Sequence, residues 1–333
     1  SRRENSTQTD ARMHFALSDV MKWWSVVLLT LSSTAAVAAQ QSAPAKQAPV
    51  VSETIAIQVK LDRAGFSSGE IDGRPGSNVK RALEGFQKVN GVTVSGVADE
   101  VTWNKLRERG SDVPPLVSYT VTESDLAGPF QPDIPADLVQ QAKLPALNYR
   151  DASEALAERF HASPALLKSL NPGATFSRPG EQVMVPNVEG ATLPAASKVT
   201  INVSKSTSTL TVVDDTGTVI FLAPVTSGSE HDPLPIGDWK VNGVQRNPAF
   251  HYNPDLFWDA RPGHSKATIQ PGPNNPVGVV WIDLSKPHYG IHGTSEPSQI
   301  GHVQSHGCVR MTNWDAQKVA QWAKPGTPVV FRE

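Results

Sequence analysis

Residues 305–311 read Ser-His-Gly-Cys-Val-Arg-Met and contain Cys308, the single cysteine of this 333-residue chain. Four of the nine histidines lie close by, between positions 288 and 311. A cysteine becomes a nucleophile where a base and a polar setting generate the thiolate. His292 and His306 are the candidates for that base. This stretch therefore predicts thiol chemistry. We expect a fold that presents the stretch on a loop.

The neighbours of Cys308 fit the same chemistry. Gly307 leaves the backbone uncrowded, so adjacent amides can converge on one oxygen, as an oxyanion hole requires. Arg310 supplies a fixed positive charge that stabilises a thiolate or binds a substrate carboxylate. His292 precedes Cys308 by 16 positions, so a loop must fold back to bring them together. A β scaffold with functional loops suits this requirement.

Residues 198–333 predict such a scaffold. Val199, Ile201 and Val203 alternate with polar residues, and a turn at 214–217 is typical of a hairpin. One helix is expected over 314–323, with Asn313 as its N-cap. We therefore expect a mainly-β domain with a C-terminal helix. Its β runs are expected at 199–203, 210–213, 219–225, 238–244, 277–282 and 327–332.

This segment resembles a known family. His292-Gly293-Thr294 followed by residues 305–311 is similar to the active-site signature of the L,D-transpeptidases, the YkuD-type catalytic domain. The similarity extends over residues 199–332 and includes three further stretches. These are Leu234-Pro235-Ile236-Gly237-Asp238-Trp239, Asn275-Pro276-Val277-Gly278 and Gly326-Thr327-Pro328-Val329. Leu234 stands where many members have Thr.

The resemblance implies a role for each residue of the signature. Cys308 is the nucleophile, and His292 is the general base and later acid, oriented by the Gly293 carbonyl. Backbone amides near Gly307 and Cys308 form the oxyanion hole. The residues implied in oxyanion or substrate binding are Ser305, His306, Gly307 and Arg310.

The implied reaction is acyl transfer on peptidoglycan tetrapeptide stems. A thioester forms, D-alanine leaves, and an amine acceptor gives a 3–3 cross-link or anchors a protein to the wall. With water as acceptor the same chemistry is an L,D-carboxypeptidase. A non-catalytic peptidoglycan-binding protein is the alternative outside enzymes. No cofactor and no metal are implied, and carbapenem-type β-lactams are expected to acylate Cys308.

A zinc site is the rival interpretation of the histidines. His288 and His292, like His302 and His306, have the i,i+4 spacing of metal ligands. Pro287 disfavours a helix at the first pair, and no Glu stands as the base of a His-Glu-x-x-His motif. An inert, buried thiol is the other alternative for the lone cysteine.

A separate helical module is predicted at residues 53–109. Val79, Leu83, Phe86 and Val89 recur at helical spacing and end at Asn90-Gly91, a helix-stop signal. Three short helices around a small core are expected. The order of its Gly-Asp-Gly turn, Ala-Leu-x-x-Phe-Gln helix and Asp-x-x-Thr-Trp-x-x-Leu close resembles the peptidoglycan-binding domain type 1 family.

Residues 110–197 begin with a Pro-rich stretch and contain a second small unit at about 149–187. Helices are expected from Ala152 to Phe160 and from Pro164 to Leu170, followed by a strand at 180–186. The pattern is similar to LysM, a small glycan-binding α+β module. Residues 119–121 resemble its first strand but lie about 30 positions early, which implies an insertion.

The N-terminal region predicts export. Residues 1–20 look like upstream or mis-called sequence, and residues 40–52 look like a linker. Residues 21–39 have a positive start, a weakly apolar run of about 16 residues and a small-x-small end, which is typical of a cleaved signal peptide. We expect a soluble protein in the periplasm or cell wall.

Composition limits the possible partners. Apolar residues make up 39% of the chain and charged residues 19%, so a buried core is available. The formal net charge of −2 gives no basic excess for nucleic acid. One cysteine excludes an intramolecular disulfide and cysteine-cluster metal sites. The expected partners are peptidoglycan stem peptides, glycan strands and, as acceptor, a wall-anchored protein. Tyr252, Phe257 and Trp258 either line a substrate cleft or close the core.

Overall fold

The computed structural model describes residues 51–110 and 112–333. The expected upstream segment 1–20, the signal peptide 21–39 and the linker up to residue 50 lie outside the described residues. Within the described ranges, no helix is long and apolar enough to cross a membrane.

The first module consists of α1 (Glu53–Arg63), α2 (Ser77–Val89) and α3 (Glu100–Gly110). The three predicted helices are confirmed. Ser52 caps α1 by accepting a hydrogen bond from the Ile55 amide. Phe66 and Phe86 meet edge to face, with ring centroids 5.4 Å apart. This core is not self-contained, because Leu222 of the third module packs into it.

The second module pairs β1 (Leu116–Thr120) with β2 (Gln182–Pro186) in antiparallel fashion. Between the strands lie α6 (Ala152–Arg159) and α7 (Pro164–Leu170), at the positions predicted. Ser163 caps α7, and Pro164 occupies its first turn, where its missing N–H costs nothing. The segment between β1 and α6 carries two short helices, α4 (Glu123–Leu126) and α5 (Leu138–Gln141).

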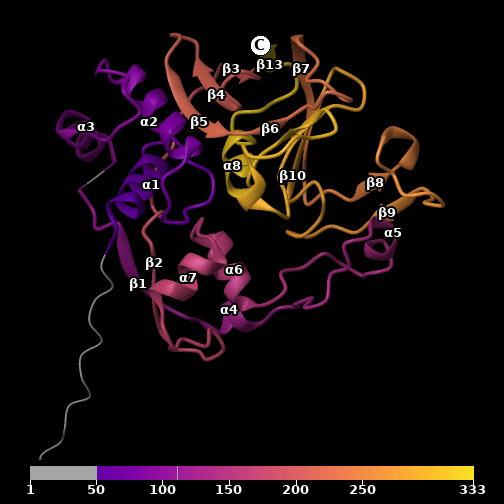
Figure 1. Cartoon of the computed structure of the whole chain (residues 1–333), viewed down its shortest axis with the longest axis horizontal. Helices are drawn as coiled ribbons and strands as arrows, with labels where there is room; N and C mark the ends of the chain where they lie inside the picture. Colours follow the sequence, from indigo (N-terminus) through magenta and orange to yellow (C-terminus); the bar gives the residue numbers. More distant parts are fainter. Residues whose placement is uncertain (1–50, 111) are drawn as a thin grey trace, which may run out of the picture. The chain divides into compact units, whose positions relative to one another are not determined.

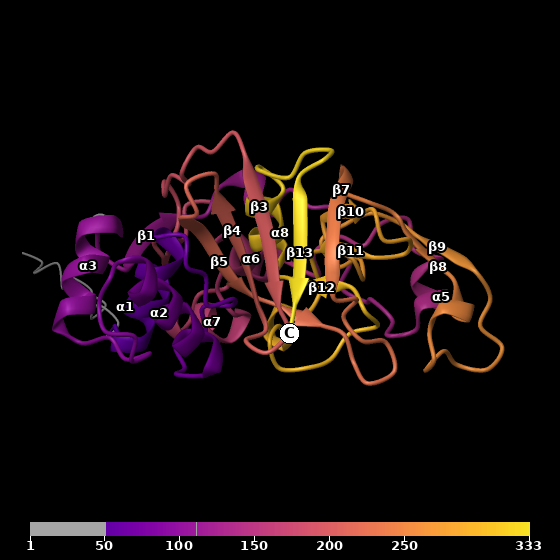
Figure 2. The same cartoon turned by 90° about the horizontal axis from the view of Figure 1, so that it is seen from above.

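The third module is built on a nine-stranded sheet with the order β5-β4-β3-β13-β7-β10-β11-β12-β6, and Figure 2 shows several of these strands side by side. The predicted mainly-β domain is confirmed. Its strands are β3 (Val199–Ser204), β4 (Thr209–Asp214), β5 (Val219–Pro224), β6 (Thr226–Ser227), β7 (Gly237–Arg246), β10 (Val280–Leu284), β11 (Gly290–His292), β12 (Val309–Arg310) and β13 (Pro328–Arg332).

The predicted C-terminal helix is α8 (Asn313–Val319), and Figure 1 shows it beside the sheet. The prediction that Asn313 caps this helix is wrong. Thr312 is the cap, because its hydroxyl accepts from the Asp315 amide and Asn313 is already helical. The side chain of Asn313 is thereby free to point elsewhere.

A small hairpin, β8 (Phe250–Tyr252) with β9 (Ala267–Ile269), stands apart from the main sheet. Leu147, Tyr252 and Ile269 form a separate buried cluster there. Leu138 of α5 packs against this cluster, and Figure 1 shows α5 next to β8 and β9. The segment inserted between β1 and α6 of the second module therefore packs against the third module.

Candidate active site

Strands β11 and β12 bring His292 and Cys308 together. They are parallel neighbours, with Ile291 opposite Val309 and His292 opposite Arg310. One step back in this register, Cys308 stands opposite Gly290. Residues two apart on a strand share a face, so extending this register to Cys308, directly before β12, puts its side chain on the same side of the sheet as that of His292.

His292 is 4% exposed and tightly held. Its Nδ1 lies 2.7 Å from the carbonyl oxygen of Gly293, and Trp281 stacks on the ring at 5.3 Å. Because a carbonyl only accepts, Nδ1 carries the proton and Nε2 is left as the acceptor. Burial, reinforced by the charge of Arg310, lowers the pKa of His292 to about 3. The imidazole is therefore neutral at physiological pH.

Cys308 is half-buried, and its Sγ lies 3.7 Å from the carbonyl oxygen of His288. Burial raises the pKa of the Cys308 thiol, and the Gly290 amide and Arg310 offset part of this increase. The resting thiol is therefore protonated. The nucleophile has to be generated during attack by a neutral base, which His292 supplies in its correct tautomer.

The loop before Cys308 is fixed by backbone geometry and by Ser305. The Ser305 hydroxyl accepts from the Gly228 amide at 2.7 Å and donates to the Cys308 carbonyl at 2.7 Å. The donor and the acceptor of this hydroxyl, for which the family resemblance implies substrate binding, are thus both engaged inside the protein. Gly307 has φ +96°, and a β-carbon there would lie 2.7 Å from the Tyr289 ring. Only glycine fits that position.

His306 and Arg310 lie at the mouth of the site. Arg310 donates to Nδ1 of His306 at 3.4 Å, and Nε2 of His306 donates to Asp259 at 2.8 Å. The Phe257 ring is 4.9 Å from His306. Trp258 is 60% exposed and stacks on His231. Of the three aromatic residues with two possible roles, Tyr252 closes a core, Phe257 packs against both that core and His306, and Trp258 is exposed beside His306.

Two sequence families match the chain. Residues 198–331 match the "L,D-transpeptidase catalytic domain" family (YkuD), and residues 51–106 match the "Putative peptidoglycan binding domain" family. "Putative L,D-transpeptidase YkuD" of Bacillus subtilis is 28% identical over 183 residues, which cover 54% of this chain and 93% of that protein. "Putative L,D-transpeptidase YqjB" of the same organism is 30% identical over 147 residues, covering 42% of this chain and 74% of that protein. The chain belongs to the YkuD-type L,D-transpeptidase family.

Several solved L,D-transpeptidase structures are also similar to part of the chain. L,D-transpeptidase 3 from Mycobacterium tuberculosis, in complex with a faropenem-derived adduct, covers 46% of this chain and 75% of that chain at 17% identity, with a TM-score of 0.34. The family matches, and not this structural likeness, make the protein an enzyme of the L,D-transpeptidase type with a peptidoglycan-binding domain before the catalytic domain.

Three residues of this L,D-transpeptidase site were not found from sequence. Trp281 stacks on His292 from β10, and a β-carbon on Gly290 would meet its ring within 2.8 Å. Tyr289 packs over Gly307. Asn313, the predicted helix cap, reaches the loop after His292 instead. No local pattern marks these three, because each contact joins residues on separate strands or loops.

The histidines do not gather into a ligand set. Among residues 51–110 and 112–333, no group of three or more His, Cys, Asp or Glu side chains is placed to hold a metal ion. His302 is exposed on the loop before Cys308. His288 has φ +69°, a left-handed conformation that is costly for a residue with a β-carbon. Its carbonyl oxygen, rather than its ring, is what meets Cys308.

Proposed function

We propose that the enzyme is a cysteine-dependent L,D-transpeptidase that acts on peptidoglycan tetrapeptide stems through a thioester. The observation that supports this is geometric: the Gly293 carbonyl fixes the tautomer of His292 on β11, and β11 pairs with β12, the strand that begins directly after Cys308. Membership of the family supplies the substrate class.

In the acylation step, the thiol proton of Cys308 passes to Nε2 of His292 as Sγ attacks the carbonyl of the third stem residue. That residue is an L-centre, either meso-diaminopimelate or L-lysine. Amides near Gly307 and Cys308 stabilise the oxyanion. The C–N bond to the terminal D-alanine then breaks, and His292 returns the proton to the leaving amine.

In the second step an amine attacks the thioester, and the C–S bond breaks to return the thiol. An amine from another stem gives a 3–3 cross-link, an amine of a protein anchors that protein, and water gives a tripeptide. Arg310 and His306 bind substrate at the mouth of the site. Ser305 acts by holding the Cys308 loop.

The N-terminal modules hold the enzyme on the wall, which raises the local concentration of stems. The β1-α6-α7-β2 order supports a LysM-like assignment for the second module. A cavity of about 430 Å³ lies beside the ends of α6 and α7, with Phe130, Asp151, Lys168 and Phe176 in its lining. We assign glycan binding to it. Cleavage of a signal peptide at 21–39 would release the protein into the periplasm or cell wall.

The test uses purified disaccharide-tetrapeptide, the mature protein and a Cys308→Ala variant, with products analysed by mass spectrometry. D-alanine release with a 3–3 dimer, dependent on Cys308 and unaffected by a chelator, is the expected result. Tripeptide alone would indicate a carboxypeptidase. The absence of any Cys308-dependent product would leave a binding protein, and inhibition by the chelator would revive the zinc interpretation.

A further inference from the structure

Asn313 is a buried amide, 1% exposed, whose hydrogen bonds are all made to other parts of the protein. Its Oδ1 accepts from the amides of Val279 and Thr294, both at 3.2 Å. Its Nδ2 donates to the Pro273 carbonyl at 3.1 Å and to the Glu158 carboxylate at 3.1 and 3.2 Å. The oxygen and the nitrogen of this side-chain amide cannot be exchanged. The backbone amides that meet Oδ1 can only donate, and the carbonyl and carboxylate that meet Nδ2 accept.

Glycines on two loops make room for this side chain. A β-carbon on Gly278 or on Gly293 would overlap Asn313 Oδ1. Gly293 lies directly after His292, so the position of Asn313 is set against the backbone that carries the base.

One peptide group links Asn313 to His292. The carbonyl of the Gly293–Thr294 peptide accepts from Nδ1 of His292, and the N–H of the same peptide donates to Asn313. In a planar trans peptide these two groups point in opposite directions. Fixing the N–H therefore fixes the carbonyl that sets the ring orientation and tautomer of His292.

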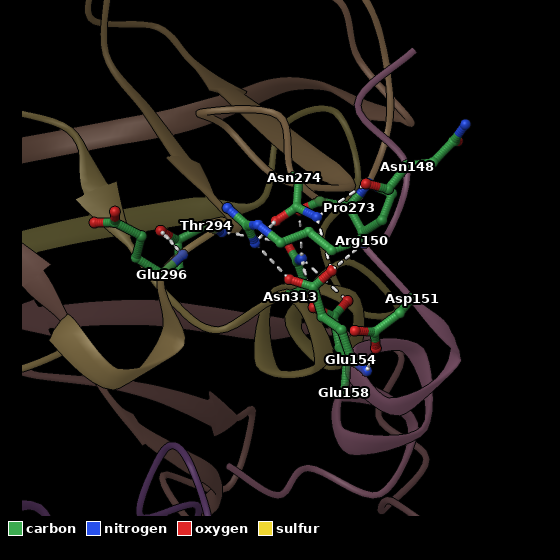
Figure 3. Close-up of polar contacts among 10 residues, drawn as sticks. All are labelled: Asn148, Arg150, Asp151, Glu154, Glu158, Pro273, Asn274, Thr294, Glu296 and Asn313. Carbon is green, nitrogen blue, oxygen red and sulfur yellow. Dashed lines mark hydrogen bonds and ion pairs between the residues drawn. The ribbon is translucent and has the colours of Figure 1, made fainter. Parts of the chain in front are cut away.

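The remaining partner of Asn313 comes from a different module. Glu158 lies on α6, is half-buried, and also accepts from the Tyr149 hydroxyl at 3.0 Å. Figure 3 shows Glu158 and Glu154 on one side of Asn313 and Asn274. Glu154, one turn earlier, accepts from Asn274 at 3.1 Å but has no hydrogen bond to Asn313. The two carboxylates thus have different roles. Glu154 docks α6 against Asn274, and Glu158 holds the side chain of Asn313.

We propose that Glu158 is a positioning residue for the transpeptidase reaction, acting through Asn313 and the Gly293–Thr294 peptide on His292. The second module then contributes to the chemical step as well as to wall binding. This inference rests on the proposed function, because it takes His292 as the base.

The test compares four variants with the wild type in kcat and KM for D-alanine release from disaccharide-tetrapeptide, and in thermal unfolding midpoint. Glu158→Ala removes the acceptor. Glu158→Asp keeps a carboxylate at this position of α6, but the shorter side chain moves it away from Asn313. Glu158→Gln keeps an acceptor, because the Tyr149 hydroxyl can turn to accept from its amide. Glu154→Ala is the matched control on the same helix.

We expect kcat to fall about tenfold in Glu158→Ala and Glu158→Asp with KM within about twofold, because a misplaced base weakens the transition state rather than substrate binding. Glu158→Gln should recover most of the loss. Glu154→Ala should lower the unfolding midpoint with kcat within about twofold of wild type. A wild-type kcat in folded Glu158→Ala or Glu158→Asp overturns the proposal. So does an equal loss in Glu154→Ala, which would mean that helix docking alone matters.

A readout independent of turnover is the Nδ1–H resonance of His292 in ¹⁵N-labelled protein. It should be sharp in the wild type, Glu158→Gln and Glu154→Ala, and broadened by exchange in Glu158→Ala and Glu158→Asp. An unchanged resonance in the last two overturns the positioning role. A wild-type enzyme no more active than Cys308→Ala would instead refute the proposed function, while this resonance would still show whether Glu158 positions the His292 ring.

Discussion

At the scale of single residues, burial determines the charge state of the reacting pair. It lowers the pKa of His292 and raises that of Cys308, so neither charged form is favoured before substrate arrives. A pre-formed thiolate–imidazolium pair would require the opposite shifts. Attack by Cys308 is therefore coupled to proton transfer, and a reactive acyl donor should depend on the base almost as strongly as a peptide does.

A carbapenem tests this coupling. Sγ of Cys308 should add to the β-lactam carbonyl and open the ring, giving an adduct equal to the whole molecule in intact mass. His292→Ala should slow the addition by about 10²-fold, the usual contribution of a general base. His302→Ala is the matched control, because His302 is an exposed histidine on the loop before Cys308, and this variant should react at the wild-type rate. An adduct on Cys308→Ala, or equal rates with and without His292, would contradict the assignment.

At the scale of elements, the loop after β11 depends on space left by glycine. Gly293→Ala should displace Asn313 and leave several buried polar groups unsatisfied, costing about 3 kcal/mol of unfolding free energy and most of the activity. Gly243→Ala, in β7, is the control, since a β-carbon there meets nothing within 4 Å. Denaturant unfolding and D-alanine release measure both effects. Wild-type unfolding free energy and D-alanine release in Gly293→Ala would show that Asn313 does not determine the conformation of this loop.

The contact between α6 and α8 also predicts a pH dependence of stability. Burial raises the pKa of Glu158 to about 7, despite hydrogen bonds from Tyr149 and Asn313 that favour ionisation, and nearby Glu154 adds to the increase. The unfolded chain releases this proton near pH 4.5, so the folded state binds more protons between pH 4.5 and 7. Stability should therefore fall as pH rises through that window, by at most about 3 kcal/mol from this group.

Glu158→Gln isolates this contribution, because it cannot ionise. Arg150 pairs with Glu154 rather than with Glu158, so this ion pair is present in both proteins. Glu70, whose pKa burial also raises to about 7, has the same sign and remains in both proteins. Unfolding free energies at pH 5 and 7 should differ less in Glu158→Gln than in the wild type. An equal difference in both proteins would show that Glu158 does not titrate in this window.

Sequence alone predicted elements well and contacts between modules poorly. The helices at 152–159 and 164–170 follow from local caps and spacing, which are properties of the segments themselves. Asn313 and Thr312 are both good cap formers, and only the loops packed on α8 decide between them. In α1, Ile55 and Val59 face the second module while Leu61 faces the first core. A helix buried on two sides shows no single apolar stripe.

At the scale of the molecule, the three modules meet at one buried cluster of charged and polar groups. Asp62 of α1 accepts from Lys318 of α8 at 3.0 Å and lies 3.0 Å from Nδ1 of His161, which follows α6. His161 also stacks on Trp314 at 5.1 Å. Ser67 donates to Asp315 at 2.8 Å in the same region. These contacts, together with Leu222 in the first core, make the described residues one structural unit.

We expect this unit to unfold in one cooperative transition that depends on Asp62. Burial alone would raise the pKa of Asp62, but Lys318 and His161 outweigh it and hold the pKa well below its usual range. Its contribution is therefore present at neutral pH and lost as pH falls into the acid range.

Asp62→Ala should cost about 3–5 kcal/mol of unfolding free energy at pH 7, because it leaves Lys318 buried without its main partner. Lys205→Met, which breaks the exposed Lys205–Glu333 pair, should change little. Denaturant unfolding followed by both tryptophan fluorescence and far-UV circular dichroism distinguishes the outcomes. Coincident curves that shift together in Asp62→Ala support a single unit. Two separated transitions in the wild type would show that the modules unfold independently.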